Sequence, residues 1–142
     1  ETKADRVYIA QPHPLTNALY LSVGIEVKRK GLAKNAIEDT LSLSEIANFA
    51  ADLSKREFIF YADVAKDVRD NRAKALFYCN GTESAVIRRL HDEQDWVGSL
   101  FVEFVYKRDD LIPATLKEML AEAANEIQYD LPEFKCANHR WK

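Results

Sequence analysis

The histidines and cysteines are the side chains best suited to metal binding or nucleophilic catalysis, but their spacing indicates neither. His13, His91 and His139 are scattered along the chain, and none has a cysteine or carboxylate at the spacing of a motif such as His-Glu-x-x-His. Cys79 lies in an apolar run, where an inert buried thiol is expected, and Cys136 lies in the polar tail. The sequence therefore predicts no metal site, and it leaves any catalytic residues unknown.

Phosphate-binding loops and exposed serine nucleophiles require glycines at fixed positions. The chain has four glycines and contains neither Gly-x-Gly-x-x-Gly, nor Gly-x-x-x-x-Gly-Lys-Ser/Thr, nor a Gly-x-Ser-x-Gly elbow. We therefore expect no cofactor bound through such loops. An enzyme would need a site assembled between subunits, because one chain offers too few convergent polar groups. The sequence favours a non-enzymatic role.

A ladder of acidic residues is a first candidate surface for a partner. Glu118, Glu122 and Glu126 stand four residues apart, so a helix places them side by side on one face. Like charges at this spacing repel one another, which a protein tolerates on a solvated face or where a basic partner docks. We expect this helix to be a protein-binding surface.

A basic segment is the second candidate surface, and it would serve a different partner. Residues 28–34 carry four positive charges, on Lys28, Arg29, Lys30 and Lys34. These side chains could bind phosphates beside an aromatic sheet, as in proteins that bind single strands. The third strand of the RNA-recognition module is matched only at Lys74 and Tyr78, so the sequence is not assigned to that family. A solvated, lysine-rich loop is the simpler interpretation.

Hydrophobic periodicity predicts seven main elements. Apolar residues alternate with a period of two over 19–27, and a capping box at Ser42 and Glu45 opens a helix that ends near Lys55. The remaining predicted elements are strands at 57–64 and 75–79, a helix at 83–93 capped by Thr82, a strand at 100–106 and a helix at about 111–127. A helix over 63–72 in place of the hairpin turn is an open alternative.

This order predicts an α+β fold of the ferredoxin-like βαββαβ type, an antiparallel sheet with helices on one face. A short N-terminal strand at 7–10 and the long C-terminal amphipathic helix are added to it. We expect one domain over 1–142, with its core at 18–108, the C-terminal helix at about 111–127 and an irregular tail at 128–142. With 142 residues and 47% hydrophobic content, the chain is large enough for one core.

If two helices cover one face of that sheet, the other face exposes aromatic side chains. Tyr20, Tyr61 and Phe101 would form its centre, and a contiguous apolar patch of this kind marks a binding surface. Three occupants remain open: the C-terminal helix, a second copy of the chain in a homodimer or higher oligomer, or nucleic-acid bases.

Overall charge and cysteine content limit the classes of protein. The net charge of −3 argues against general affinity for polyanions, and the longest apolar runs are far shorter than a membrane span. Two cysteines are too few for a disulfide framework, so we expect reduced thiols and a cytoplasmic location.

Together these observations predict a small non-enzymatic binding protein of the inhibitor, immunity or adaptor type that acts through protein–protein contacts. Two alternatives stay open. One is a module that binds RNA or single-stranded nucleic acid through the aromatic sheet face and the basic loop. The other is an oligomeric enzyme or small-ligand regulatory domain with a site between subunits.

Overall fold

The computed structural model describes residues 4–14, 17–37, 40–92, 95–108 and 110–127. The predicted irregular tail at 128–142 lies outside these residues, as do Cys136 and His139. The strands are β1 (Arg6–His13), β2 (Tyr20–Lys28), β3 (Leu41–Ser42), β4 (Phe58–Tyr61), β5 (Ser84–Asp92) and β6 (Asp95–Phe104). The helices are a 3-10 turn η1 (Leu43–Ile46), α1 (Ala47–Lys55), α2 (Val64–Asp67), α3 (Asn71–Asn80) and α4 (Pro113–Ile127).

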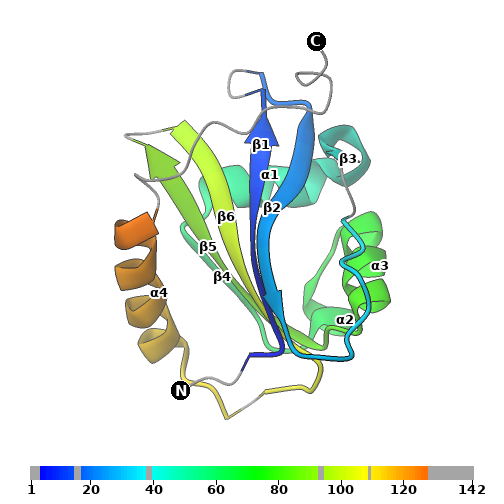
Figure 1. The fold of residues 1–142 in the computed structure, drawn as a ribbon, viewed down its shortest axis with the longest axis vertical. Helices are drawn as coiled ribbons and strands as arrows, with labels where there is room; N and C mark the ends of the chain where they lie inside the picture. Colours follow the sequence, from blue (N-terminus) through cyan, green and yellow to red (C-terminus); the bar gives the residue numbers. More distant parts are fainter. Residues whose placement is uncertain (1–3, 15–16, 38–39, 93–94, 109, 128–142) are drawn as a thin grey trace.

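The described strands form a single antiparallel sheet in the order β3-β2-β1-β6-β5-β4. The predicted ferredoxin-like βαββαβ sheet is therefore wrong. The N-terminal strand is not an addition to the core, because β1 lies at its centre and pairs with both β2 and β6. Figure 1 shows β1 between its two neighbours, with α3 and α4 on opposite sides of the sheet.

The largest error in the predicted elements falls on residues 71–92. The segment 75–79, predicted as a strand, belongs to helix α3, and the predicted helix at 83–93 is strand β5. Asp70 caps the start of α3 by accepting a hydrogen bond from the Ala73 amide, and Gly81 ends the helix in the left-handed region at φ +74°. These two caps outweigh the aromatic, strand-like composition of the segment between them.

The predicted capping box is also wrong. The Ser42 side chain does not cap a backbone amide of the first turn, and its hydroxyl is instead hydrogen-bonded to that of Ser44 at 2.9 Å. Glu45 instead forms an ion pair with Arg72 at 3.3 Å. The helix therefore begins with the tighter turn η1 and becomes regular only at Ala47.

The period-two pattern of β2 is interrupted by a bulge. Ile9 pairs with Ile25 but Ala10 pairs with Val23, so Gly24 is an extra residue. Before the bulge, Leu21 and Val23 pack into the main core. Beyond it, Ile25 and Val27 are exposed, because the extra residue reverses the direction of the side chains.

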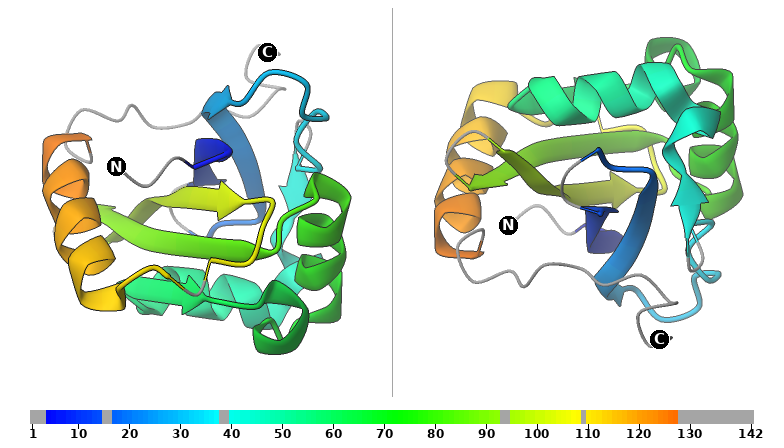
Figure 2. Two further views of the ribbon diagram at one scale, coloured as in Figure 1. Left: turned by 90° about the horizontal axis from the view of Figure 1, so that it is seen from below. Right: turned by 90° about the horizontal axis from the view of Figure 1, so that it is seen from above.

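Helices cover both faces of the sheet. Figure 2 shows α1 lying along one face of the sheet and α4 at the side away from α3. The main core lies under α1 and α3, whereas Leu116, Leu120 and Ala124 of α4 pack against the other face. Both faces of β5 and β6 are apolar because each meets a helical layer.

Asp70 also joins two helices. One carboxylate oxygen accepts from the Ala73 amide at 3.0 Å, and the other accepts from the Phe49 amide of α1 at 3.3 Å. We expect Asp70→Ala to lower the free energy of unfolding by about 1–2 kcal/mol in urea denaturation. Asp70→Asn, which keeps one acceptor oxygen, should lose less than half of that. Equal losses in the two variants would show that the cap does not stabilise α3.

Candidate ligand-binding surfaces

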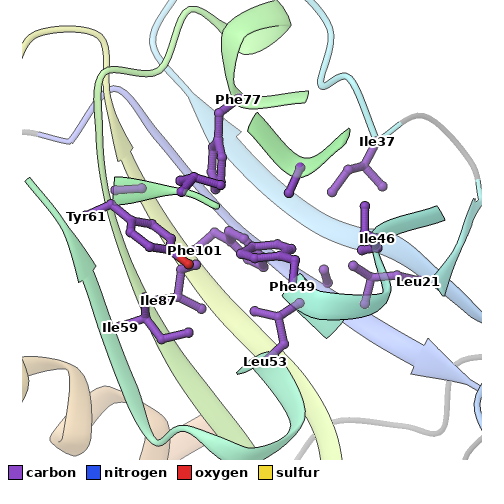
Figure 3. Packing of buried hydrophobic residues seen from close by; sticks show 14 of the residues in the cluster. Leu21, Ile37, Ile46, Phe49, Leu53, Ile59, Tyr61, Phe77, Ile87 and Phe101 are labelled. Atoms are coloured by element: carbon purple, nitrogen blue, oxygen red, sulfur yellow. The ribbon is translucent and has the colours of Figure 1, made fainter. Parts of the chain in front are cut away.

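The space between the sheet and helices α1 to α3 is filled by side chains. Figure 3 shows Phe49, Phe77 and Phe101 packed together, with Tyr61 beside them. The ring of Tyr8 stacks on Phe101 with centroids 4.7 Å apart. The gap left among these side chains is about 10 Å³, which is no larger than a single water. A ligand cannot enter this layer without displacing core side chains.

The aromatic residues predicted for an open sheet face do not form one. Tyr61 and Phe101 are 7% and 1% exposed and lie in the core under α1 and α3. Tyr20 is partly exposed at the β2 end of the sheet, where its ring lies 5.6 Å from His13. The prediction failed because Tyr61 and Phe101 point toward α1 and α3. The C-terminal helix, considered as a cover for their face, packs as α4 against the opposite face.

The two charged surfaces lie where the sequence suggested, but nothing in the structure tests whether they bind a partner. Glu118, Glu122 and Glu126 are exposed on α4. Lys28, Arg29, Lys30 and Lys34 are exposed at the end of β2 and in the segment after it. Arg29 pairs with Asp5 at 2.8 Å, and Lys28 donates to the Leu32 carbonyl at 3.1 Å.

The side chains first considered for chemistry are separated in space. Among the described residues, no group of three His, Cys, Asp or Glu side chains is placed to hold a metal ion. His13 is buried beside Ser22, with Nε2 and Oγ 2.9 Å apart, and His91 lies in β5. Cys79 is exposed on α3, not buried as its apolar context suggested. No helix of the described part of the chain is long and apolar enough to span a membrane.

A buried carboxylate that the sequence analysis did not single out organises one end of the sheet. Glu103 of β6 is 1% exposed. Its carboxylate accepts hydrogen bonds from Tyr8 at 2.5 Å, Thr82 at 2.6 Å and Asn80 at 3.4 Å. The guanidinium of Arg6 lies 3.8 Å away. Burial raises the pKa of Glu103 despite these donors.

The same network holds the segment after β2. Arg6 pairs with Glu26 at 3.0 Å and donates to the Ala33 carbonyl, while Asn35 donates to Glu26 at 2.8 Å. Asn80, at the end of α3, accepts from the Ala36 amide at 2.7 Å. Residues 33–36 are thus joined by hydrogen bonds to both the sheet and α3.

The first surface hollow, which we call the α2–α3 groove, has a volume of about 740 Å³. It is lined by Asp63, Val64, Ala65, Lys66, Asn71, Lys74, Ala75, Tyr78, Thr82, Glu83 and Lys107. Tyr78 is 83% exposed. Lys107 lies 3.5 Å from Asp63, whereas Lys66 and Lys74 add further positive charge. The lining thus combines apolar surface with three lysines and two acidic residues, Asp63 and Glu83, and this excess of positive charge suits an anion that carries a hydrophobic body.

The second hollow, which we call the β4 cleft, has a volume of about 810 Å³. It is lined by Asn48, Phe49, Ala51, Asp52, Arg56, Phe60, Tyr61, Lys66, Asp67, Val68, Arg69 and Asp70. Burial, with a smaller contribution from Asp52, raises the pKa of Tyr61 to about 12. Tyr61 is therefore a neutral hydroxyl in this cleft at physiological pH.

Comparison with known proteins identifies the fold. The sequence matches no protein-family model and no curated protein. The phycocyanobilin-bound GAF domain of a cyanobacterial phytochrome is similar in structure, with a TM-score of 0.71 at 16% identity over 89% of this chain and 74% of that one. A domain of a sensor histidine kinase protein from Sinorhizobium meliloti has a TM-score of 0.65 at 14% identity, over 89% of this chain and 78% of that one. The chromophore-binding domain of a bacteriophytochrome from R. palustris has a TM-score of 0.69 at 12% identity, over 91% and 49%.

These neighbours show that the chain has the fold of GAF domains, and they correct two predictions. The fold is not ferredoxin-like, because the neighbours share the six-stranded antiparallel sheet flanked by helices. The prediction of an inhibitor, immunity or adaptor protein is also wrong, because the neighbours are chromophore-binding and sensor domains.

The pKa of Glu103 provides a test of the buried network. We expect Glu103→Gln to lower the free energy of unfolding by about 1–3 kcal/mol, because the Gln amide group would face donors instead of accepting from them.

The size of this loss should depend on pH. A group whose pKa is raised in the folded state stabilises the fold most at low pH, and this contribution is lost as pH rises through the folded pKa. Glutamine does not titrate. The stability difference between wild type and variant, measured in urea, should therefore widen as pH falls from about 8 to about 5. A difference that narrows would contradict the raised pKa.

Proposed function

We propose that this chain is a sensory domain that binds a small molecule in the α2–α3 groove. The ligand is an organic anion with a hydrophobic body, such as a hydrophobic carboxylate. The observation that carries the proposal is a groove of about 740 Å³ lined by apolar surface and three lysines, on a fold similar to chromophore-binding domains. We include a cytoplasmic location in the proposal, since the exposed Cys79 thiol suits a reducing compartment.

The size of the groove favours it over the interior of the fold. Pockets for organic ligands have volumes of about 300–1,000 Å³. The gap under α1 and α3 has a volume of about 10 Å³, so a bilin like that of the cyanobacterial neighbour does not fit there in this structure. The α2–α3 groove is within the required range and needs no rearrangement of the core.

The chemistry of the groove defines the ligand. Val64, Ala65 and Ala75 contribute aliphatic surface, and the Tyr78 ring can cover a hydrophobic chain or ring. The ammonium groups of Lys66 and Lys74 supply charge for a carboxylate. Because an exposed ion pair contributes little free energy, most of the affinity should come from the apolar body of the ligand.

Helix α3 connects the groove to the interior. Lys74 and Tyr78 lie on its groove side, whereas Ala73 and Phe77 are buried in the main core. Asn80, at the end of the same helix, holds residues 33–36 through the Ala36 amide. A ligand that moves or orders α3 therefore acts on a second segment, which is what a sensory domain requires.

Decanoate is a suitable probe for this proposal. We expect saturable binding at one site by isothermal titration calorimetry, together with a rise in melting temperature. Lys74→Glu and Tyr78→Ala should each weaken binding by about tenfold, the scale of 1.4 kcal/mol. Lys117→Glu and Tyr106→Ala are matched controls, since both residues are exposed and lie outside the groove. Butyrate, which lacks the long chain, should bind far more weakly.

Two results would overturn the proposed function. One is the absence of saturable decanoate binding to the folded wild-type protein. The other is equal affinity in wild type, Lys74→Glu and Tyr78→Ala, which would place the anion elsewhere on the molecule.

A further inference from the structure

The face of the sheet that α4 contacts is covered at one side only. Val7 and Ile9 of β1 pack into the apolar clusters beneath α4. Ile25 and Val27 of β2 lie directly opposite these two residues, so their side chains point to the same face. They are nevertheless 56% and 72% exposed. Figure 1 shows the reason, because α4 lies at the β5 side of the sheet, away from β2. We call the exposed apolar area formed by Ile25 and Val27 the β2 face.

Helix α4 forms a wall beside the β2 face. Near the start of the helix, Leu116 clusters with Phe104, the last residue of β6. Near its end, Ala124 clusters with Leu100, so α4 runs in the opposite direction to β6. In a right-handed helix with this direction, Met119 lies on the flank that faces β1 and β2. Met119 is 45% exposed, so it adds apolar surface to the β2 face.

This wall is acidic. Glu122 and Glu126 follow Met119 by three and seven residues, which places these three side chains on one flank of α4. Glu118 lies one turn before Glu122 and is exposed. Lys117, the one basic residue of α4, lies on the other flank, because positions two residues apart do not face each other. The flank toward β2 therefore has net negative charge.

The end of β2 is basic. Lys28 follows Val27, and Lys30 and Lys34 lie in the segment after the strand, where all three lysines are exposed. The sequence between positions 27 and 36 contains no acidic residue. The other charges at this end form ion pairs within the chain: Arg29 with Asp5, and Arg6 with Glu26 and Glu103. Net positive charge therefore borders the β2 face at one end, and net negative charge borders it along α4.

From these observations we propose that the β2 face is the interface of a symmetric homodimer. Each copy places the acidic flank of α4 against the β2 face of the other, and the two α4 helices run antiparallel about a two-fold axis. Ile25, Val27 and Met119 of both copies form the apolar centre. Removal of these exposed side chains from water supplies favourable free energy of association.

Charge complementarity selects a second copy as the occupant. Lys28 and the start of α4 both lie at the Phe104 end of β6. Antiparallel helices bring the end of one α4 level with the start of the other, so the acidic flank of one copy meets the basic end of β2 in its partner. The pairs are Glu122 and Glu126 with Lys28 and Lys30. The two-fold axis forms each pair twice, and the pairs relieve the repulsion within the acidic ladder.

Charge reversal tests this interface, with sedimentation equilibrium as the measurement. We expect the wild-type chain to be a dimer. Because symmetry doubles each change, Glu122→Lys with Glu126→Lys should weaken the dimer by at least about tenfold, and Lys28→Glu with Lys30→Glu should do the same. An equimolar mixture of the two double variants should form a heterodimer of about wild-type affinity, since every pair again joins opposite charges.

Two further variants separate the interface from general effects of charge. Lys55→Glu is the matched control: Lys55 is exposed on α1, which covers the opposite face of the sheet, so dimer affinity should change by less than about twofold. Val27→Glu tests the apolar centre. It should give a monomer that circular dichroism shows to be folded, since Val27 is exposed in the single chain.

Three results would overturn the homodimer. One is a wild-type chain that stays monomeric up to millimolar concentration. Another is a dimer that both double variants retain at wild-type affinity. The third is a mixture of the two double variants that fails to associate although each is folded. The substituted residues lie outside the α2–α3 groove lining, so decanoate binding should be unchanged in these variants, and the two proposals can fail independently.

Discussion

The buried carboxylate of Glu103 is the constraint on which the arrangement of the other elements depends. A carboxylate removed from water is strongly destabilising unless donors surround it. The donors here come from separate parts of the chain: Tyr8 from β1, and Asn80 and Thr82 from the end of α3 and the turn after it. Arg6 adds its charge and also binds Glu26 of β2. The network is therefore satisfied only when β1, β6 and α3 are all in place.

This constraint also relates the interior to the surface. Helix α3 is fixed at its start by the Asp70 cap and at its end by Gly81 and the Asn80 contacts. The residues between these points face the core on one side and the α2–α3 groove on the other. Under the proposed function, ligand binding at the groove would act on residues 33–36 through α3 and the Asn80 contact to the Ala36 amide, with no need for a ligand in the core. A filled interior is therefore compatible with ligand binding in the α2–α3 groove.

The sequence was informative where local patterns decide the structure. The alternation over 100–106 lies largely within β6, and the apolar stripe at about 111–127 coincides with α4. The sequence was misleading where contacts between residues far apart in the chain decide the structure. Phe77, Tyr78 and Cys79 have strand-like composition, yet the segment is a helix because Asp70 and Gly81 cap it, and both residue types are typical helix caps. Glu103 had no local signal, because its partners lie between 21 and 97 positions away and only the sheet register brings Arg6 opposite to it.

The central claim is that α3 couples the groove to the Glu103 network, and amide hydrogen exchange with and without decanoate tests it most directly. The account predicts that decanoate slows exchange in residues 71–80 and also in residues 33–37, which lie outside the groove. In Glu103→Gln, the effect on 71–80 should persist while the effect on 33–37 is lost. Protection confined to 71–80 in the wild-type protein would contradict the coupling, even if decanoate binds as proposed.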